Sequence, residues 1–230
     1  MQPSGHASGG QANARRPGTI RVEYKNTYAL DVMGKRIGKE YKDMINIADT
    51  AARAAVELSQ ALLHVCPEEL GAFMQEILKA KKIYVAGAGR SLLMLRCFAM
   101  RLMHVGLTSY VTGDTTTPAF ESGDLMIIAS GSGETSGLIA IAEKVKRLNG
   151  TLAVITIQAE TPLGSRADVL VKVPAYTDKI ENGAMKKTIL PGGSLFEQSV
   201  LFLADAMILP LAEKMGVATD RAFSRHANLE

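Results

Sequence analysis

The stretch from residue 124 to 148 constrains the fold most, because a buried strand, a small-residue loop and a helix follow one another directly. It reads DLMIIASGSGETSGLIAIAEKVKRL. The run Leu125 to Ala129 is continuously apolar, as are the strands of a parallel sheet that is covered on both faces. After the loop, apolar residues recur at helical spacing: Leu138, Ile141, Ala142, Val145 and Leu148. A strand that leads into an amphipathic helix is the repeating unit of an α/β fold.

The loop itself, SGSGET, has the composition of an anion site. Glycines let backbone amides approach an anion closely, and hydroxyl groups supply donors without bulk. The helix that follows adds N–H groups without helical partners and the positive end of its dipole. A plain glycine–serine turn does not require this density of donors, so the loop predicts a phosphate site. It lacks the Gly-Lys-Ser/Thr ending of a nucleotide P-loop. The candidate ligands are Ser130, Gly131, Ser132, Gly133, Glu134 and Thr135.

The rest of the chain repeats the alternation of strands and helices. Strands are expected at 83–86, 110–111, 125–129, 152–157 and 169–173, and helices at 41–63, 67–79 and 194–215 and from near Ser91, Thr135 and Pro162. This order predicts an α/β fold, a doubly wound five-stranded parallel sheet flanked by helices, with an N-terminal helical extension. The 230 residues fit one domain, 40–230, after a flexible basic arm, 1–39, that starts with Gly, Ser, Ala and Gln.

Several motifs together resemble a known family. SGSGET after an apolar strand is similar to sugar isomerase (SIS) domains, which bind phosphosugars. Further motifs narrow the resemblance: GAGRS (87–91), FAMRLMHVG (98–106), TPLG (161–164), SLFE (194–197) and RHANLE (225–230). In this order they resemble the 6-phospho-3-hexuloisomerase family over residues 40–230. The resemblance implies a SIS-type sheet of the flavodoxin-like or Rossmann-like kind.

The resemblance also implies a reaction and its context. Members of this family interconvert D-arabino-3-hexulose 6-phosphate and D-fructose 6-phosphate by an enediol proton transfer, without a cofactor or metal ion. This is the second step of formaldehyde fixation in the ribulose monophosphate pathway, after hexulose-6-phosphate synthase. A homotetramer is implied as well, in agreement with the large apolar surface of the helix at 194–215. Two alternatives are another phosphosugar aldose–ketose isomerase and a non-catalytic phosphosugar-sensing regulator.

GAGRS follows a strand and opens a helix, so a dinucleotide site was weighed against the phosphosugar site. Asp114 lies near the distance at which a ribose-binding acid occurs. However, Leu92 stands where the third glycine of GxGxxG is needed for close packing beneath a pyrophosphate. The GAGRS and SGSGET turns follow strands that we expect to be neighbours, and would therefore face one crevice. We favour the phosphosugar, with Ser91 as a contact and Arg90 nearby.

A carboxylate suits the carbonyl shift, because one group can remove a carbon-bound proton and return it to the next carbon. Glu197 follows Pro-Gly-Gly in the first turn of an apolar helix and matches the base of the family's LFE motif. Judged without the resemblance, it would only complement the helix dipole. Glu134 is the rival, but repulsion from a bound phosphate makes it better suited to ordering the loop or binding a hydroxyl. The resemblance implies that His226, in RHANLE, shuttles protons.

Composition limits which binding partners and which cellular compartment are expected. The net charge is +3 with interspersed signs, which does not demand a nucleic acid, and the basic N-terminal stretch shows no compact three-helix pattern. Cys66 and Cys97 form no CxxC, and no His/Glu cluster has metal-ligand spacing, so no metal is expected. We expect no apolar run of membrane-spanning length and no signal peptide. These features predict a cytoplasmic protein that contacts no membrane.

Overall fold

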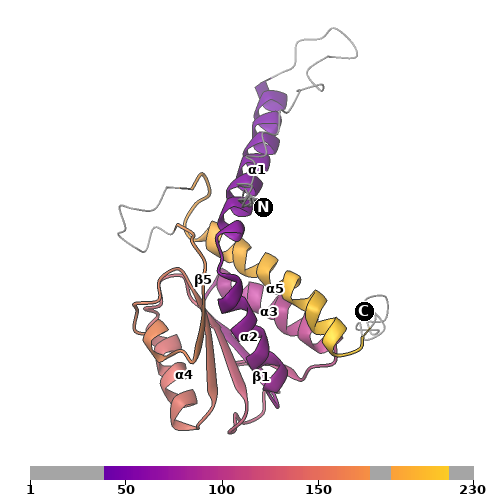
Figure 1. The fold of residues 1–230 in the computed structure, drawn as a ribbon. Helices are drawn as coiled ribbons and strands as arrows, with labels where there is room; N and C mark the ends of the chain where they lie inside the picture. Colours follow the sequence, from indigo (N-terminus) through magenta and orange to yellow (C-terminus); the bar gives the residue numbers. More distant parts are fainter. Residues whose placement is uncertain (1–38, 177–187, 218–230) are drawn as a thin grey trace, which may run out of the picture. The chain divides into compact units, whose positions relative to one another are not determined.

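The computed structural model describes residues 39–176 and 188–217, with side chains from residue 46 onward (Figure 1). The chain divides into a short unit, 1–43, and a compact unit, 44–230. The described part of the short unit is the start of helix α1 (Lys39–Leu63), which continues into the compact unit. The expected arm, apart from Lys39, lies outside the described residues, as do Arg225 and His226 of RHANLE.

The compact unit contains a five-stranded, all-parallel sheet. Its strands are β1 (Ile83–Gly87), β2 (Ser109–Val111), β3 (Leu125–Ala129), β4 (Thr151–Thr156) and β5 (Val169–Lys172). They lie in the order β2-β1-β3-β4-β5, with Ile83 of β1 in register with Leu125 of β3. The predicted sheet is therefore confirmed. Central strands β3 and β4 are almost wholly buried, as their continuous apolar sequences require.

The helices follow the prediction with one exception. The helices besides α1 are α2 (Pro67–Lys79), α3 (Arg90–His104), α4 (Ser136–Arg147) and α5 (Ser194–Lys214). The prediction of a helix from near Pro162 was wrong. The connection between β4 and β5 contains only a short 3₁₀ turn, η2 (Gly164–Arg166). The Thr161 hydroxyl accepts the Gly164 N–H at 3.1 Å. This side-chain bond holds a local turn in place of a regular helix.

Helices cover both faces of the sheet (Figure 1). One core includes α2, α3 and α5 with strand residues such as Val85 and Ile127, and the other includes α4 with Tyr84 and Ile128. Adjacent strand residues thus face opposite cores, as the pleat dictates. The chain leaves β1 toward one face and β3 toward the other, so the sheet is doubly wound. Between β1 and β3 lies the topological switch point, where open α/β sheets bind ligands.

Helix α5 corrects one sequence expectation. Among the described residues, this one helix is long and apolar enough to cross a membrane by length and composition, so the expectation of no such run was wrong. Half of its apolar window is buried inside the fold. Val200 and Leu211 are fully buried, and α5 packs along α3. Its apolar composition is therefore explained by its place in the core, since core helices are often long and apolar as well.

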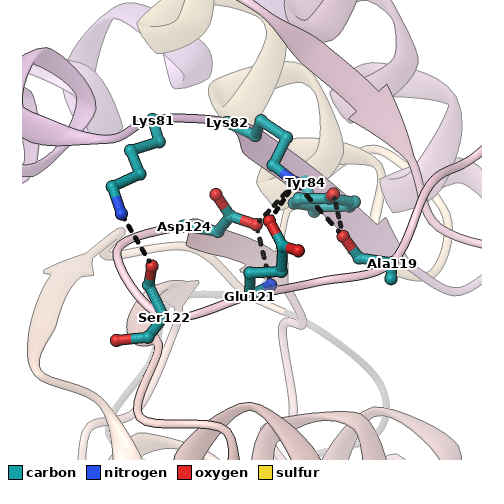
Figure 2. Close-up of polar contacts among 7 residues, drawn as sticks. All are labelled: Lys81, Lys82, Tyr84, Ala119, Glu121, Ser122 and Asp124. Carbon is teal, nitrogen blue, oxygen red and sulfur yellow. Dashed lines mark hydrogen bonds and ion pairs between the residues drawn. The ribbon is translucent and has the colours of Figure 1, made fainter.

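A polar cluster at the amino-terminal ends of β1 and β3, opposite the switch point, fixes the long connection from β2 to β3 (Figure 2). Lys82 Nζ lies 2.9 Å from Glu121 Oε2 and 3.5 Å from Oδ2 of the buried Asp124. The same Asp124 oxygen accepts the Glu121 N–H at 2.8 Å, and the Tyr84 hydroxyl donates to the Ala119 carbonyl at 2.8 Å. The connection, 112–124, consists of turns and irregular backbone. These side chains supply the anchorage that a crossover helix provides elsewhere.

The ion pair also changes the acidity of its members. The hydrogen bond from Lys82 lowers the pKa of Glu121. The same hydrogen bond raises the pKa of Lys82; burial opposes the rise and the charge of Asp124 supports it. A lowered folded-state pKa means that Glu121 contributes stability above its ordinary pKa, and that this contribution is lost as pH falls through the folded value.

We predict that Lys82→Met lowers the melting temperature by several degrees, because it leaves the buried Asp124 carboxylate without its charge partner. Lys81→Met is the matched control, since Lys81 Nζ donates to the carbonyl of the exposed Ser122 at 3.3 Å and makes no drawn contact with Asp124 (Figure 2). Calorimetry at neutral pH and in acid should show the difference shrinking as Glu121 becomes protonated. Equal melting temperatures for the two variants at neutral pH would contradict this role of Lys82.

Candidate active site

The two loops predicted to face one crevice do so at the carboxyl edge of β1 and β3. A small cavity of about 80 Å³ opens there. It is lined by Ala88, Ser91, Ala129, Ser130, Gly131, Ser132, Thr135, Leu138, Gly193, Phe196 and Glu197. Ser91 comes from the first turn of α3, the SGSGET residues come from the loop after β3, and Glu197 comes from the first turn of α5. Segments far apart in sequence therefore meet at the switch point.

Three helices begin at this cavity. The N-cap residues of α3, α4 and α5 are Gly89, Thr135 and Gly193, and none makes a side-chain capping bond. The first-turn N–H groups of each helix therefore have no cap to accept their hydrogen bonds. Each N-terminus also carries the positive end of a helix dipole. Their convergence on one cavity favours a negatively charged ligand more than a single helix N-terminus does.

Backbone hydrogen bonds orient the SGSGET loop. The Gly131 carbonyl accepts the Ile157 N–H at 3.3 Å, and the Gly133 carbonyl accepts the Leu163 N–H at 3.0 Å. In a planar trans peptide the next N–H points opposite to the carbonyl. The N–H groups of Ser132 and Glu134 are therefore directed away from the β4–β5 connection. The Glu134 N–H donates to Ser132 Oγ at 3.4 Å, so of the two it is the Ser132 N–H that can donate to an anion beside the loop.

The TPLG segment packs against the SGSGET loop at Gly133. Gly133 has a positive φ of 65°, and a Cβ at this position would lie 2.2 Å from Thr161 Oγ1. Thr161 and Leu163 are buried. Only glycine fits here without displacing Thr161. TPLG, which resembles a family motif, thus supports the loop at Gly133, whose small size matters because Thr161 packs against it.

The predicted base makes an ion pair across the cavity rim. Glu197 lies in the first turn of α5, and its side chain is 16% exposed. Its Oε2 is 3.1 Å from Nε of Arg90, the first residue of α3. Arg90 also donates from Nη1 to Ser194 Oγ at 3.0 Å. Arg90 was expected near the substrate, among the binding residues, and in this structure it contacts Glu197 and is half-exposed beside the residues that line the cavity.

Other candidates fall into two groups. Ser91 and Ser130 are buried at the cavity, and the Ser130 hydroxyl accepts the Gly133 N–H at 3.2 Å. Glu134, in contrast, is exposed and does not line the cavity. Gly193 and Phe196 line it from α5, although sequence reasoning did not select them. Across the part of the chain that the structure describes, no group of three His, Cys, Asp or Glu side chains is placed to hold a metal.

Comparison with known proteins agrees with this architecture. The model of the SIS domain matches residues 76–201. The 3-hexulose-6-phosphate isomerase of Bacillus subtilis is 45% identical over 174 residues, which cover 76% of this chain and 94% of that protein. The protein of the same name from Mycobacterium gastri is 41% identical over 184 residues, or 80% of this chain and 86% of that protein.

Solved structures give the same assignment of the fold. A hypothetical protein of Methanococcus jannaschii, whose crystal structure was used to infer a 3-hexulose-6-phosphate isomerase function, has a TM-score of 0.65 and 32% sequence identity. The similarity covers 80% of this chain and 99% of that one. The SIS match spans more than half of the chain and includes both loops of the cavity and Glu197. The chain therefore belongs to the SIS domain family.

Proposed function

We propose that this protein is a 6-phospho-3-hexuloisomerase, which interconverts D-arabino-3-hexulose 6-phosphate and D-fructose 6-phosphate. The observation that carries the proposal is one small cavity in which an anion site, made by three helix N-termini, adjoins a single ion-paired carboxylate. A phosphosugar supplies the anion, and the carboxylate supplies the base for a proton shift. The relatives named 3-hexulose-6-phosphate isomerase support this choice of substrate.

In this proposal the phosphate lies in the SGSGET loop. The Ser130, Ser132 and Thr135 hydroxyls and the amides of the loop surround it, with Gly131 and Gly133 as the positions that leave room. Hydrogen bonds to a charged group are about twice as strong as neutral ones, so several donors fix the phosphate end of the sugar. Ser91, buried on the other side of the cavity, reaches the phosphate or a sugar hydroxyl.

Glu197 is the proposed base. Starting from the 3-ketose, its carboxylate takes the proton from C2, and the electrons of the broken C–H bond form the C2–C3 double bond. The carbonyl oxygen on C3 takes up the negative charge, which gives a 2,3-enediolate. The protonated Glu197 then returns the proton to C3, while the hydroxyl proton of O2 is transferred to O3. No oxidant or external reductant is needed, which fits a mechanism without a cofactor.

A second group is needed for the transfer between O2 and O3. We propose His226 for this role, on the basis of the RHANLE resemblance alone, since the residue lies outside the described part of the chain. Histidine can donate and accept protons near neutral pH. Glu134 is exposed at the loop. Its proposed role is to order the SGSGET loop or to bind a hydroxyl group of the sugar.

The metabolic setting is proposed on the same basis. The substrate would be the product of hexulose-6-phosphate synthase, in formaldehyde assimilation through the ribulose monophosphate pathway, in the cytoplasm. The direct test is an assay of fructose 6-phosphate formation from enzymatically prepared hexulose phosphate. Arabinose 5-phosphate serves as the alternative substrate. A protein that binds phosphosugars but converts neither would instead be a phosphosugar-sensing regulator.

We also propose that the protein assembles as a homotetramer. Large apolar side chains are exposed on two helices: Leu63 of α1 is 72% exposed, and Phe202 and Leu209 of α5 are 54% and 63% exposed. Next to Phe202, a groove of about 400 Å³ is lined by residues of α1. Contiguous exposed apolar surface of this kind marks association sites. A second copy of the chain is the occupant that a symmetric assembly supplies.

Glu197→Gln should retain the fold and phosphosugar binding and reduce kcat by about 10²–10⁴-fold, the usual contribution of positioned proton transfer. The change keeps the size of the side chain and removes the basic oxygen. Glu213→Gln, an exposed position on the same helix, is the matched control. Turnover near that of the wild type in Glu197→Gln would exclude Glu197 as the proton carrier and direct attention to Glu134.

Replacing both Ser132 and Thr135 by Ala should mainly weaken binding. Each change removes a donor to a charged phosphate, worth about 1.5–3 kcal/mol, or roughly tenfold or more in Kd. Calorimetric titration with fructose 6-phosphate measures the loss, and Ser136→Ala, exposed at the start of α4, is the control. If the double variant bound the ligand as tightly as the wild type, the phosphate would lie elsewhere.

Replacing Phe202 and Leu209 together by Glu should shift the protein toward smaller species, because charges would be buried in the proposed interface. Sedimentation velocity reports the change in mass. Lys214→Glu, exposed at the end of α5, introduces a negative charge outside this apolar surface and should leave the assembly intact. An unchanged sedimentation coefficient in the double variant would remove these two side chains from any interface.

A further inference from the structure

Ser194 holds a buried hydroxyl that no step of the proposed reaction uses. The residue is 3% exposed and is the first residue of α5. The N-cap of α5 is Gly193, so the Ser194 hydroxyl does not cap the helix. It accepts the Arg90 Nη1–H at 3.0 Å instead. The side chain therefore serves a contact between α5 and α3.

Arg90 is held by two acceptors from one helical turn. Ser194 and Glu197 are three residues apart on α5, so their side chains lie on the same face of that helix. Arg90 donates a hydrogen bond from Nη1 to Ser194 Oγ at 3.0 Å, and its Nε lies 3.1 Å from Glu197 Oε2 in an ion pair. The guanidinium is planar and its donors have fixed directions. The hydrogen bond to Ser194 and the ion pair with Glu197 therefore hold the guanidinium against α5, next to the carboxylate of Glu197.

We propose that Ser194 and Arg90 are positioning residues that hold Glu197 Oε2, so that Oε1 is the atom that takes the substrate proton. The inference rests on the proposed isomerase function. Arg90 is ion-paired with Oε2, which holds this oxygen on the Arg90 side, while Glu197 lines the cavity. Ser194 acts one step further back, because it orients the donor and touches neither the carboxylate nor the ligand site.

This arrangement also directs charge during the reaction. When Oε1 accepts the proton from C2, Glu197 becomes neutral and the enediolate becomes negative. Arg90 neither gains nor loses a proton, so its positive charge is then beside a neutral acid and close to the new anion. A fixed charge aimed at the place where negative charge develops lowers the barrier without reorganisation. Correct placement is essential, since a shift of about 1 Å can cost about 10²-fold in rate.

Stability is a poor explanation for the same contacts. The Arg90 side chain is 53% exposed, and exposed ion pairs contribute little to folding. Loss of the Ser194 hydroxyl should therefore leave the melting temperature almost unchanged. An effect on kcat without an effect on folding separates positioning from a structural role.

The test compares Ser194→Ala, Ser194→Thr, Arg90→Met and the Arg90→Met/Ser194→Ala double variant. Ser194→Ala should reduce kcat about tenfold or more, with KM within about twofold, and Ser194→Thr should restore most of the rate. In the Arg90→Met background, Ser194→Ala should have no further effect, because the donor it orients is gone. Ser199→Ala is the control, since Ser199 is buried on the same helix and donates to the Leu195 carbonyl at 2.7 Å.

A second measurement does not depend on activity. In ¹⁵N-edited spectra the guanidinium N–H resonances of Arg90 should be protected from exchange in the wild type, and they should lose protection in both Ser194→Ala and Glu197→Gln. Unchanged protection in Ser194→Ala would overturn the inference, whether or not the wild type is an isomerase. A full tenfold further loss of kcat in the double variant would overturn it as well. A wild type inactive on hexulose phosphate would refute the proposed function, while the exchange measurement still decides the role of Ser194.

Discussion

The parallel pairing of β1 with β3 is the constraint on which the rest of the site depends. Because the chain leaves β1 toward one face and β3 toward the other, α3 and α4 start from adjacent strand ends without competing for space. Helix α5 adds a third N-terminus from a distant part of the sequence. Three helix N-termini, none with a side-chain cap, then lie around one cavity, and this geometry follows from topology before any side chain is considered.

The arrangement has an energetic cost in the free protein. The glycine N-caps of α3 and α5 stabilise their helices less than Ser, Thr, Asn or Asp would, by about a few tenths of a kcal/mol each, and the positive dipole ends repel when they converge. In the proposed site, a bound phosphate would relieve this repulsion. The Arg90–Glu197 pair fits the same scheme. Glu197 places a negative charge in the first turn of α5, where it complements the dipole, and Arg90 joins that carboxylate to the start of α3.

Much of the fold was predictable because its signals are local. The strands β3 and β4 are continuous apolar runs, and α4 has a clear helical period. The turn near Pro162 was not predictable from periodicity, since the Thr161 hydroxyl replaces a regular helix by side-chain bonding. The ion pair of Arg90 with Glu197 joins residues more than a hundred positions apart, which no local pattern encodes. Glu197 itself was selected because SLFE resembles a family motif.

The two ends of the strands have different functions in the fold. At the amino-terminal ends, Lys82 is ion-paired with Asp124, and Asp124 accepts the Glu121 N–H, which fixes the connection to β3. At the carboxyl edge, hydroxyls and amides of the SGSGET loop bond to one another and also line the cavity that we propose for the phosphate. Ser194 lies behind the residues that line the cavity, and its buried hydroxyl accepts a hydrogen bond from Arg90. In the proposed mechanism, the position of the Glu197 base thus depends on a residue that is buried in the packing of α5 against α3.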